Sequence, residues 1–190
     1  MKIKYNSPVV LTFTIISAAV LLLSSTIMKG LAADWFMVPG RDGFHPGQLR
    51  SWIILFTHVI GHADWDHLIS NFSFILLLGP ILEENYGSVS LVIMIALTAL
   101  VTGILNVMLF PSALLGASGV VFMMILLASF TNFNKGEIPL TFILVLIIYL
   151  GREIFNSFAA DNISEFAHIV GGFVGSLFGF FRPARSPAKK

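Results

Sequence analysis

The sequence predicts an all-α membrane protein in which six helices cross the bilayer as one bundle. Hydrophobic residues make up 56% of the 190 residues and charged residues only 11%, and the mean hydropathy is +0.90. Soluble chains contain roughly 45–50% apolar and about 25% charged residues. Because so few charges cannot cover this apolar surface in water, we expect lipid to surround the helices. The length suits a single domain over residues 1–190.

The spans follow from the apolar segments and from the residues that interrupt them. A helix needs about 20 mostly apolar residues to cross the hydrocarbon core. Glu83 and Glu84 bound the second segment, Pro111 separates the third from the fourth, and Pro139 suits the first turn of the fifth. The expected spans are residues 8–28, 65–82, 88–110, 114–130, 139–155 and 166–181.

The first connection is long, and we expect it on the outer side of the membrane. Residues 32–64 mix Gly, Pro and charged residues with an apolar piece over residues 52–60. That piece is too short to span comfortably, so it is typical of an interfacial or re-entrant element.

The basic residues predict the orientation of the bundle. With both termini in the cytoplasm, seven of the eleven Lys and Arg residues lie inside and four lie outside, as the positive-inside rule requires. The amino-terminal segment also resembles a signal peptide, with Leu31-Ala32-Ala33 as its cleavage site. Its apolar stretch is longer than the usual core of about 7–15 residues, so we favour an uncleaved first span.

Composition also excludes several classes of function. The net charge of +1 and the lack of a basic run before the short tail exclude nucleic acid as a partner. The chain has no cysteine, which excludes disulfides, thiolate catalysis and cysteine-based metal sites.

Polar side chains gather at the first turns of three expected spans. His67 and Asn71 are four residues apart on the second span and share a helix face. Ser118 opens the fourth span and His168 opens the sixth. Because these three spans run in the same direction, their first turns lie at one level near the outer surface. The sequence therefore predicts that the four side chains converge.

This set of side chains can perform nucleophilic catalysis. A serine hydroxyl is a weak nucleophile until a base accepts its proton, and histidine is suited to that near neutral pH. Backbone N–H groups at the start of the fourth span, with the Asn71 amide and the His67 ring, can stabilise an oxyanion. Because no span places a carboxylate beside His168, we expect a dyad and not a triad.

Each of these features also has a structural interpretation. Gly116 and Gly119 allow close approach of the backbone, but small residues also pack ordinary membrane helices. Gly171, Gly175 and Gly179 form a ridge of small residues that predicts close packing of the sixth span. Phe122 shares a face with Ser118, and it can stack on His168 or serve as an ordinary core residue.

Jointly, these motifs resemble the rhomboid intramembrane serine proteases, in their six-span bacterial form, over nearly the whole chain. The matching positions are His62, His67-Leu-Ile-Ser-Asn71, Gly116-Ala-Ser118-Gly119 and His168-x-x-Gly171-x-x-x-Gly175, with Thr57-His58 and Glu83-x-x-x-Gly87 also similar. The resemblance implies that Ser118 is the nucleophile and His168 the general base. It implies an oxyanion hole of Asn71, His67 and the Ser118 N–H. The supporting residues are then His62, Gly116, Gly119, Phe122 and Gly171.

The resemblance further implies hydrolysis of peptide bonds in or near the transmembrane segments of substrate proteins. No metal or organic cofactor is needed, and the expected partners are such substrates and membrane lipids, with no particular oligomeric state. The compact form indicates a bacterial inner membrane, with the active site open to the outer side. Two positions depart from the family: Trp52 is followed by Ile53 where Arg is frequent, and Phe122 stands where Tyr is frequent.

Two other functions stay open at this point. A catalytically silent rhomboid-like protein that binds membrane clients would share the fold, although it would not need both Ser118 and His168. A metal carrier is the second alternative, because the first connection and the start of the second span offer several ligands. These are His58, His62, His67, Asp64 and Asp66. No further ladder of His or acidic residues crosses the membrane, as a transport path would require.

Overall fold

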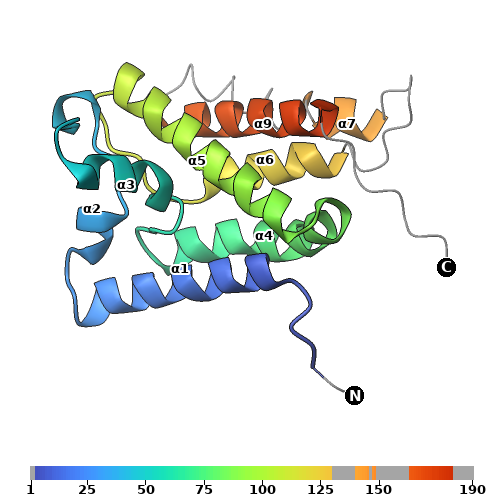
Figure 1. Ribbon diagram of the computed structural model, residues 1–190, viewed down its shortest axis with the longest axis horizontal. Coiled ribbons are helices and arrows are strands. Elements are labelled where there is room, and N and C mark those ends of the chain that lie inside the picture. The colour runs from blue at the N-terminus through green and yellow to red at the C-terminus, as the bar shows by residue number, and fades with distance from the viewer. Residues whose placement is uncertain (1–2, 130–139, 146, 149–162, 182–190) are drawn as a thin grey trace.

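Helices joined by loops form the described part of the chain, residues 3–129, 140–145, 147–148 and 163–181 of a computed structural model (Figure 1). Within these ranges the one β-type pairing is an isolated bridge between Val38 and Leu114. The elements named in Figure 1, with the short 3₁₀-helix η1, are α1 (Pro8–Thr26), α2 (Leu31–Trp35), η1 (Arg41–Gly43), α3 (Leu49–Thr57), α4 (Trp65–Tyr86), α5 (Ser88–Leu109), α6 (Ser118–Ser129), α7 (Leu140–Val145) and α9 (Ile163–Phe181).

Three of the described helices are long and apolar enough to cross a membrane: α1, α4 and α5. They correspond to the expected spans over residues 8–28, 65–82 and 88–110. α6 and the stretch Ile169–Phe178 of α9 are shorter apolar helices. Of the expected fifth span, residues 140–145 form α7, and most of the remainder lies outside the described residues. The described chain is therefore an all-helical protein with membrane-spanning helices.

α4 is longer at its end than the sequence predicts. Its end was expected at residue 82, before two acidic residues, but the helix continues to Tyr86. Glu83 does not end it, because its side chain turns inward and is buried. The helix ends instead at Gly87, whose φ of 84° is open to glycine and costly for other residues.

α6 begins later than predicted, at Ser118 and not near residue 114. The preceding residues take part in loop pairing, which keeps them out of the helix. Leu114 exchanges both backbone hydrogen bonds with Val38 (2.9 and 2.8 Å), and the Arg41 N–H donates to the Phe110 carbonyl (2.9 Å). The first connection therefore holds the segment that leads into α6.

The first connection does not cross the bundle. Its α3 has nine residues, which is too short for a span. It buries Ser51, Ile54 and Leu55, whereas Trp52 and Phe56 are exposed. This one-sided burial agrees with the predicted interfacial or re-entrant element.

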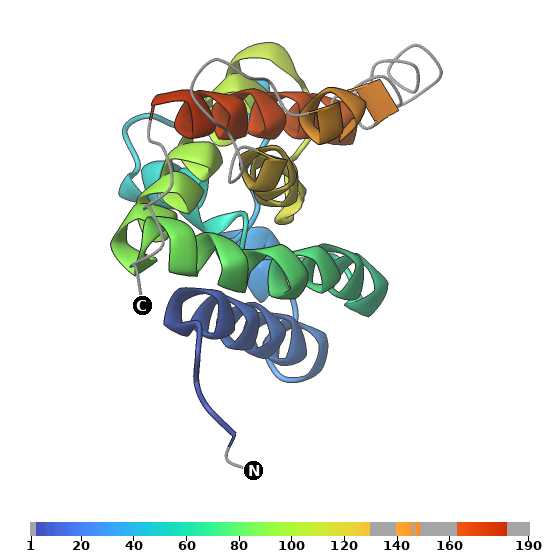
Figure 2. The same ribbon diagram turned by 90° about the vertical axis from the view of Figure 1, so that its right-hand side faces the viewer.

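The long helices are stacked around α6. Figures 1 and 2 show α1, α4, α6 and α9 one above the other, with α5 crossing them obliquely. α6 packs most extensively against α9 and next against α4. Nine consecutive residues of α6, Gly119 to Leu127, are buried. α6 is thus the central helix, and it packs between α4 and α9.

Candidate active site

The loop before α6 is fixed by hydrogen bonds from three directions. The Gly116 N–H donates to the His58 carbonyl (3.0 Å), and Leu114 is paired with Val38. The Asn106 Nδ2 of α5 donates to the Ser112 carbonyl (3.0 Å). Because this segment is not helical, its backbone groups need such partners from elsewhere in the chain. Ser118 is consequently held at one position, half-buried, as the first residue of α6.

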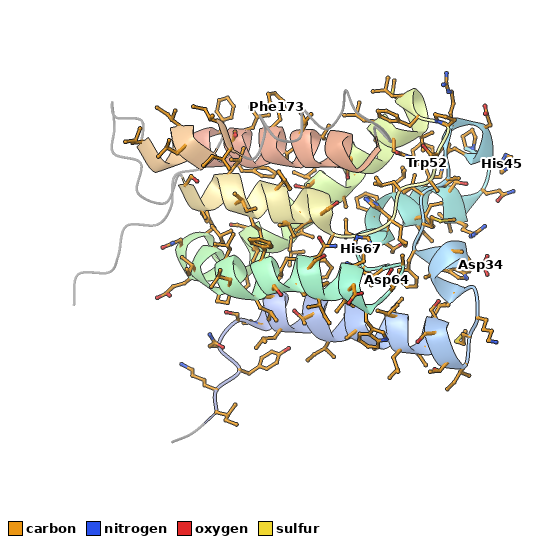
Figure 3. All side chains as sticks on the ribbon, turned by 180° about the vertical axis from the view of Figure 1, so that it is seen from behind. Asp34, His45, Trp52, Asp64, His67 and Phe173 are labelled. Atoms are coloured by element: carbon orange, nitrogen blue, oxygen red, sulfur yellow. The ribbon has the colours of Figure 1, made fainter. Side chains whose placement is uncertain are left out.

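His67 and Asn71 of α4 lie directly over this segment. At Gly116 the φ is +117°, and an added Cβ would lie 2.6 Å from Cε1 and Nε2 of His67 and 3.8 Å from Nδ2 of Asn71. Only glycine leaves room for that ring and tolerates that φ. Figure 3 shows His67 between the starts of α4 and α6. The structure thus brings His67 and Asn71 together two residues before Ser118.

The middle of α9 lies against the first two turns of α6. A Cβ added at Gly171 would collide with the backbone of Gly119, and one added at Gly175 would collide with that of Met123. From Gly171 to Gly175 the contacted residue of α6 also advances by four, from Gly119 to Met123. α6 and α9 therefore run parallel. At Gly171 and Gly175, the ridge predicted from the sequence is therefore in contact with the α6 backbone; the surroundings of Gly179 lie outside the described part of the structure.

His168 lies in α9, one helical turn before Gly171. Its side chain lies outside the described part of the structure, so the dyad itself rests on the sequence. Phe122, one turn after Ser118, is buried in α6.

His62 contacts Asn71 from the first connection. Its Nε2 is 3.2 Å from Asn71 Nδ2, and its Nδ1 is 3.1 Å from the Ile60 carbonyl oxygen. The ring is buried and packs edge-on against His67, with centroids 5.0 Å apart. Burial lowers the pKa of His62 to about 4, and the nearby His67 lowers it further against the opposing effects of the Ile60 carbonyl and Asp64. The ring is therefore neutral at pH 7.

His58 fixes the other side of the loop. Its Nδ1 is 3.2 Å from the Leu55 carbonyl oxygen, and its Nε2 is 3.4 Å from the hydroxyl of Thr102 in α5. Burial lowers the pKa of His58 to about 4, against the opposing effect of the Leu55 and Ile54 carbonyls. Since the His58 carbonyl also accepts from Gly116, this residue joins α3, α5 and the loop before α6.

The sequence interpretation missed the polar face of α5 that supports this loop. Thr98, Thr102 and Asn106 are buried and recur every four residues, so they lie on one helix face. Thr102 contacts His58 and Asn106 holds Ser112. The signal was present in the sequence, because three polar residues at this spacing in a span usually face the protein interior.

The first connection is anchored without the family's Trp-Arg pair. The indole Nε1 of Trp52 donates to the Pro46 carbonyl (2.9 Å). The Arg50 side chain donates to the Asp34 carbonyl and lies 3.8 Å from the Asp34 carboxylate. Although Arg precedes Trp here, both side chains therefore still bind backbone carbonyls within the first connection.

Two histidines of the first connection, His58 and His62, are occupied by protein partners. Both ring nitrogens of His58 and of His62 contact protein groups. Asp64 serves as the N-cap of α4, where its carboxylate accepts from the His67 N–H at 2.7 Å. Over the ranges that the structure describes, no three His, Cys, Asp or Glu side chains are grouped to hold a metal ion.

Comparison with known proteins finds a matching family and two similar proteins. The family model described as Rhomboid domain matches residues 49–185. The chain is 24% identical to "Rhomboid protease GlpG" of Haemophilus influenzae over 127 residues, which cover 65% of this chain and 66% of that protein. It is also 24% identical to "Rhomboid-like protein 11, chloroplastic" of Arabidopsis thaliana over 152 residues, 78% of this chain and 51% of that protein. The chain thus spans just under two thirds of the first relative and about half of the second.

Proposed function

The chain belongs to the rhomboid family, and on that basis we propose that it is an intramembrane serine endopeptidase. It hydrolyses peptide bonds in or near the transmembrane segments of other membrane proteins. One observation carries the proposal: His67 and Asn71 lie over the backbone at Gly116, two residues before Ser118. The similarity to a relative named as a protease supports the same activity.

In this proposal Ser118 and His168 form the catalytic dyad. The Ser118 Oγ attacks the scissile carbonyl carbon while His168 accepts the hydroxyl proton. The Ser118 N–H, the Asn71 amide and the His67 ring stabilise the resulting oxyanion. His168 then gives its proton to the leaving amine, which departs and leaves an acyl-enzyme. Water, deprotonated by His168, hydrolyses the ester and restores Ser118. No step needs a metal or a cofactor.

The supporting residues have structural tasks in the same site. Gly116 leaves space for the His67 ring, and Gly119 and Gly171 allow α6 and α9 to touch at backbone level. Phe122 supplies a ring one turn below Ser118, and His62 contacts Asn71. These contacts support a pre-formed site in which binding does not have to assemble the oxyanion hole.

We further propose that residues 1–190 form a single six-span domain with a long first outer loop. α6, the region that contains α7, and α9 supply the three spans beyond α1, α4 and α5. Both termini lie in the cytoplasm of a bacterial cell, and the site opens to the outer side of the inner membrane, where water reaches Ser118. Substrates carry a weak helix near the cut, because a regular helix hides its carbonyls in hydrogen bonds.

Cleavage of a single-span substrate in liposomes tests the function. We expect wild type to cleave it with or without chelator, and Ser118→Ala and His168→Ala to lose cleavage by at least about 10³-fold. Ser129→Ala is a matched control, because that serine lies in the same helix and its hydroxyl donates only to the Ile125 carbonyl in the described contacts. It should cleave like wild type.

Three results would contradict the proposal. Cleavage that survives Ser118→Ala would remove the nucleophile assigned here. Activity lost in chelator would indicate a metal-dependent protein. A substrate that co-purifies with every variant and is never cut would indicate a silent client-binding protein.

A further inference from the structure

We propose that His62 is a positioning residue that fixes the Asn71 side-chain amide in the orientation an oxyanion hole needs. The inference rests on the proposed function, because it assigns the support of that same hole. It depends on one chain of contacts that runs from the Ile60 carbonyl through the His62 ring to Asn71. The donor and acceptor roles of these groups allow only one placement of the hydrogens along the series of contacts.

The first link settles where the His62 proton lies. The Ile60 carbonyl oxygen can only accept, so the Nδ1 that lies 3.1 Å from it must carry the hydrogen. A neutral imidazole carries hydrogen on one nitrogen only. Nε2 of His62 is therefore a bare acceptor.

The second link settles which way the amide faces. An acceptor at Nε2 requires a donor opposite, so the Asn71 atom 3.2 Å away must be the NH₂ nitrogen and not the oxygen. That same Nδ2 lies 3.8 Å from where a Cβ on Gly116 would stand. Nδ2 has a second hydrogen that the contact with His62 does not use, and we infer that this hydrogen is the oxyanion donor.

The alternative orientation would oppose catalysis. A flipped amide would direct its carbonyl oxygen toward the place where the proposed oxyanion forms, and two negative oxygens would repel each other. An oxyanion-hole donor is worth about 10²–10³ in rate only if it already points at the developing charge. Without a partner of fixed polarity, both amide orientations would be populated.

The surroundings hold His62 rigidly enough for this task. The residue is 1% exposed, and its ring packs against those of His67 and Phe72, with centroids 5.0 and 5.6 Å away. Next to it, a Cβ added to Gly61 would lie 2.6 Å from Leu115 and from Phe36. The backbone is thus confined on the side that leads to the loop before α6. Groups that orient a catalytic side chain need such confinement.

The kinetic test uses two replacements of the ring and a double-mutant cycle. His62→Phe keeps the ring volume and removes both nitrogens, and it should lower kcat about 10–100-fold with little change in KM. His62→Gln should restore part of that rate, because its NH₂ can donate to the Ile60 carbonyl and its oxygen can then accept from Asn71. On an Asn71→Ala background, His62→Phe should reduce the residual rate by less than about twofold, since its target is gone.

His58→Phe is the matched control for a purely structural effect. His58 is equally buried, but its ring contacts Leu55 and Thr102 and not Asn71. The fold-loss in kcat from His58→Phe should therefore be the same on the wild-type and on the Asn71→Ala background. If His62→Phe is also additive with Asn71→Ala, or if it lowers only the Tm, the positioning role is wrong.

A spectroscopic readout separates this inference from the proposed function. Nitrogen-15 NMR of the histidine-labelled full chain in micelles should show a neutral His62 protonated on Nδ1, assigned by the signals lost in His62→Phe. A proton on Nε2 would overturn the inference whatever the activity. An Nδ1 proton in a wild-type protein that cuts no substrate would instead contradict the proposed function and leave the orientation of Asn71 intact.

Discussion

The single carboxylate of Glu83 links α4, which carries it, to the starts of α1 and α5. Its oxygens accept from the N–H groups of Val9 and Val10 (3.1 and 3.2 Å), at the start of α1. One of them also accepts from the hydroxyl of Ser88 (2.7 Å), at the start of α5. α1 has no side-chain cap of its own, so a negative group from α4 satisfies its free N–H groups and meets the positive end of its dipole.

Replacement of Glu83 should therefore destabilise the protein, although the residue lies in the last turn of α4. Glu83→Gln should lower the free energy of unfolding by about 1–3 kcal/mol, because an amide group replaces one accepting oxygen and leaves an N–H group without a partner. Thermal or denaturant unfolding in micelles measures this loss. Glu84→Gln, at the exposed neighbouring position, should change the unfolding free energy by less than about 0.5 kcal/mol. Equal effects of the two changes would mean that the carboxylate contacts contribute nothing.

At the scale of elements, the contact between α6 and α9 decides how closely the two helices that carry the proposed dyad approach each other. Gly119 and Gly171 meet at backbone level, and the parallel run of the two helices keeps the ridge in contact over a further turn at Gly175. Membrane helices gain little from the hydrophobic effect, so close packing of small residues supplies the attraction. In the proposed mechanism, this contact brings the turn of α9 that carries His168 towards Ser118.

Gly171→Ala should separate the two helices. The new methyl group would overlap the Gly119 backbone, and such overpacking costs about 1–3 kcal/mol or displaces the helix. We expect a lower unfolding midpoint and cleavage reduced by at least about 10²-fold, because a shift near 1 Å disturbs catalytic geometry. Phe173→Ala tests the outer face of the same helix, where the side chain is exposed (Figure 3). Comparable loss of cleavage in both variants would contradict this account.

At the scale of the whole molecule, two buried neutral histidines link folding to pH. His58 and His62 have pKa values of about 4 in the folded protein and about 6.5 in an unfolded chain. Between these values the unfolded state binds more protons. The stability that the neutral rings contribute is therefore complete above pH 6.5 and is lost as pH falls toward 4.

This linkage predicts a steep loss of stability in mild acid. Each histidine should account for up to roughly 3 kcal/mol of unfolding free energy between pH 6.5 and 4. Denaturant unfolding in micelles at several pH values in that range measures the slope. The His58→Gln, His62→Gln double variant should show a much flatter dependence, since glutamine does not titrate. A double variant with the slope of wild type would place the acid sensitivity elsewhere.

Much of this architecture could be predicted from local patterns of residues. The apolar segments gave the helices α1, α4, α5 and α9 to within a few residues, and the short apolar piece gave α3. His67 and Asn71 of the second expected span lie against Gly116, two residues before Ser118. The rhomboid resemblance agrees with the family match over residues 49–185. These inferences succeed because helix length and periodicity follow from the chain and the bilayer alone.

Other features depend on contacts between residues far apart in the chain. The end of α4 at Gly87 depends on an inward turn of Glu83 toward α1, and the start of α6 at Ser118 depends on the pairing of Leu114 with Val38. The orientation of Asn71 depends on a histidine nine residues earlier, brought back by the first connection. Composition and period report which face of a helix is apolar. They do not indicate which donor binds which acceptor when the two are far apart in the chain. Only the tertiary structure decides those pairs, because each polar group must find a partner once packing excludes water.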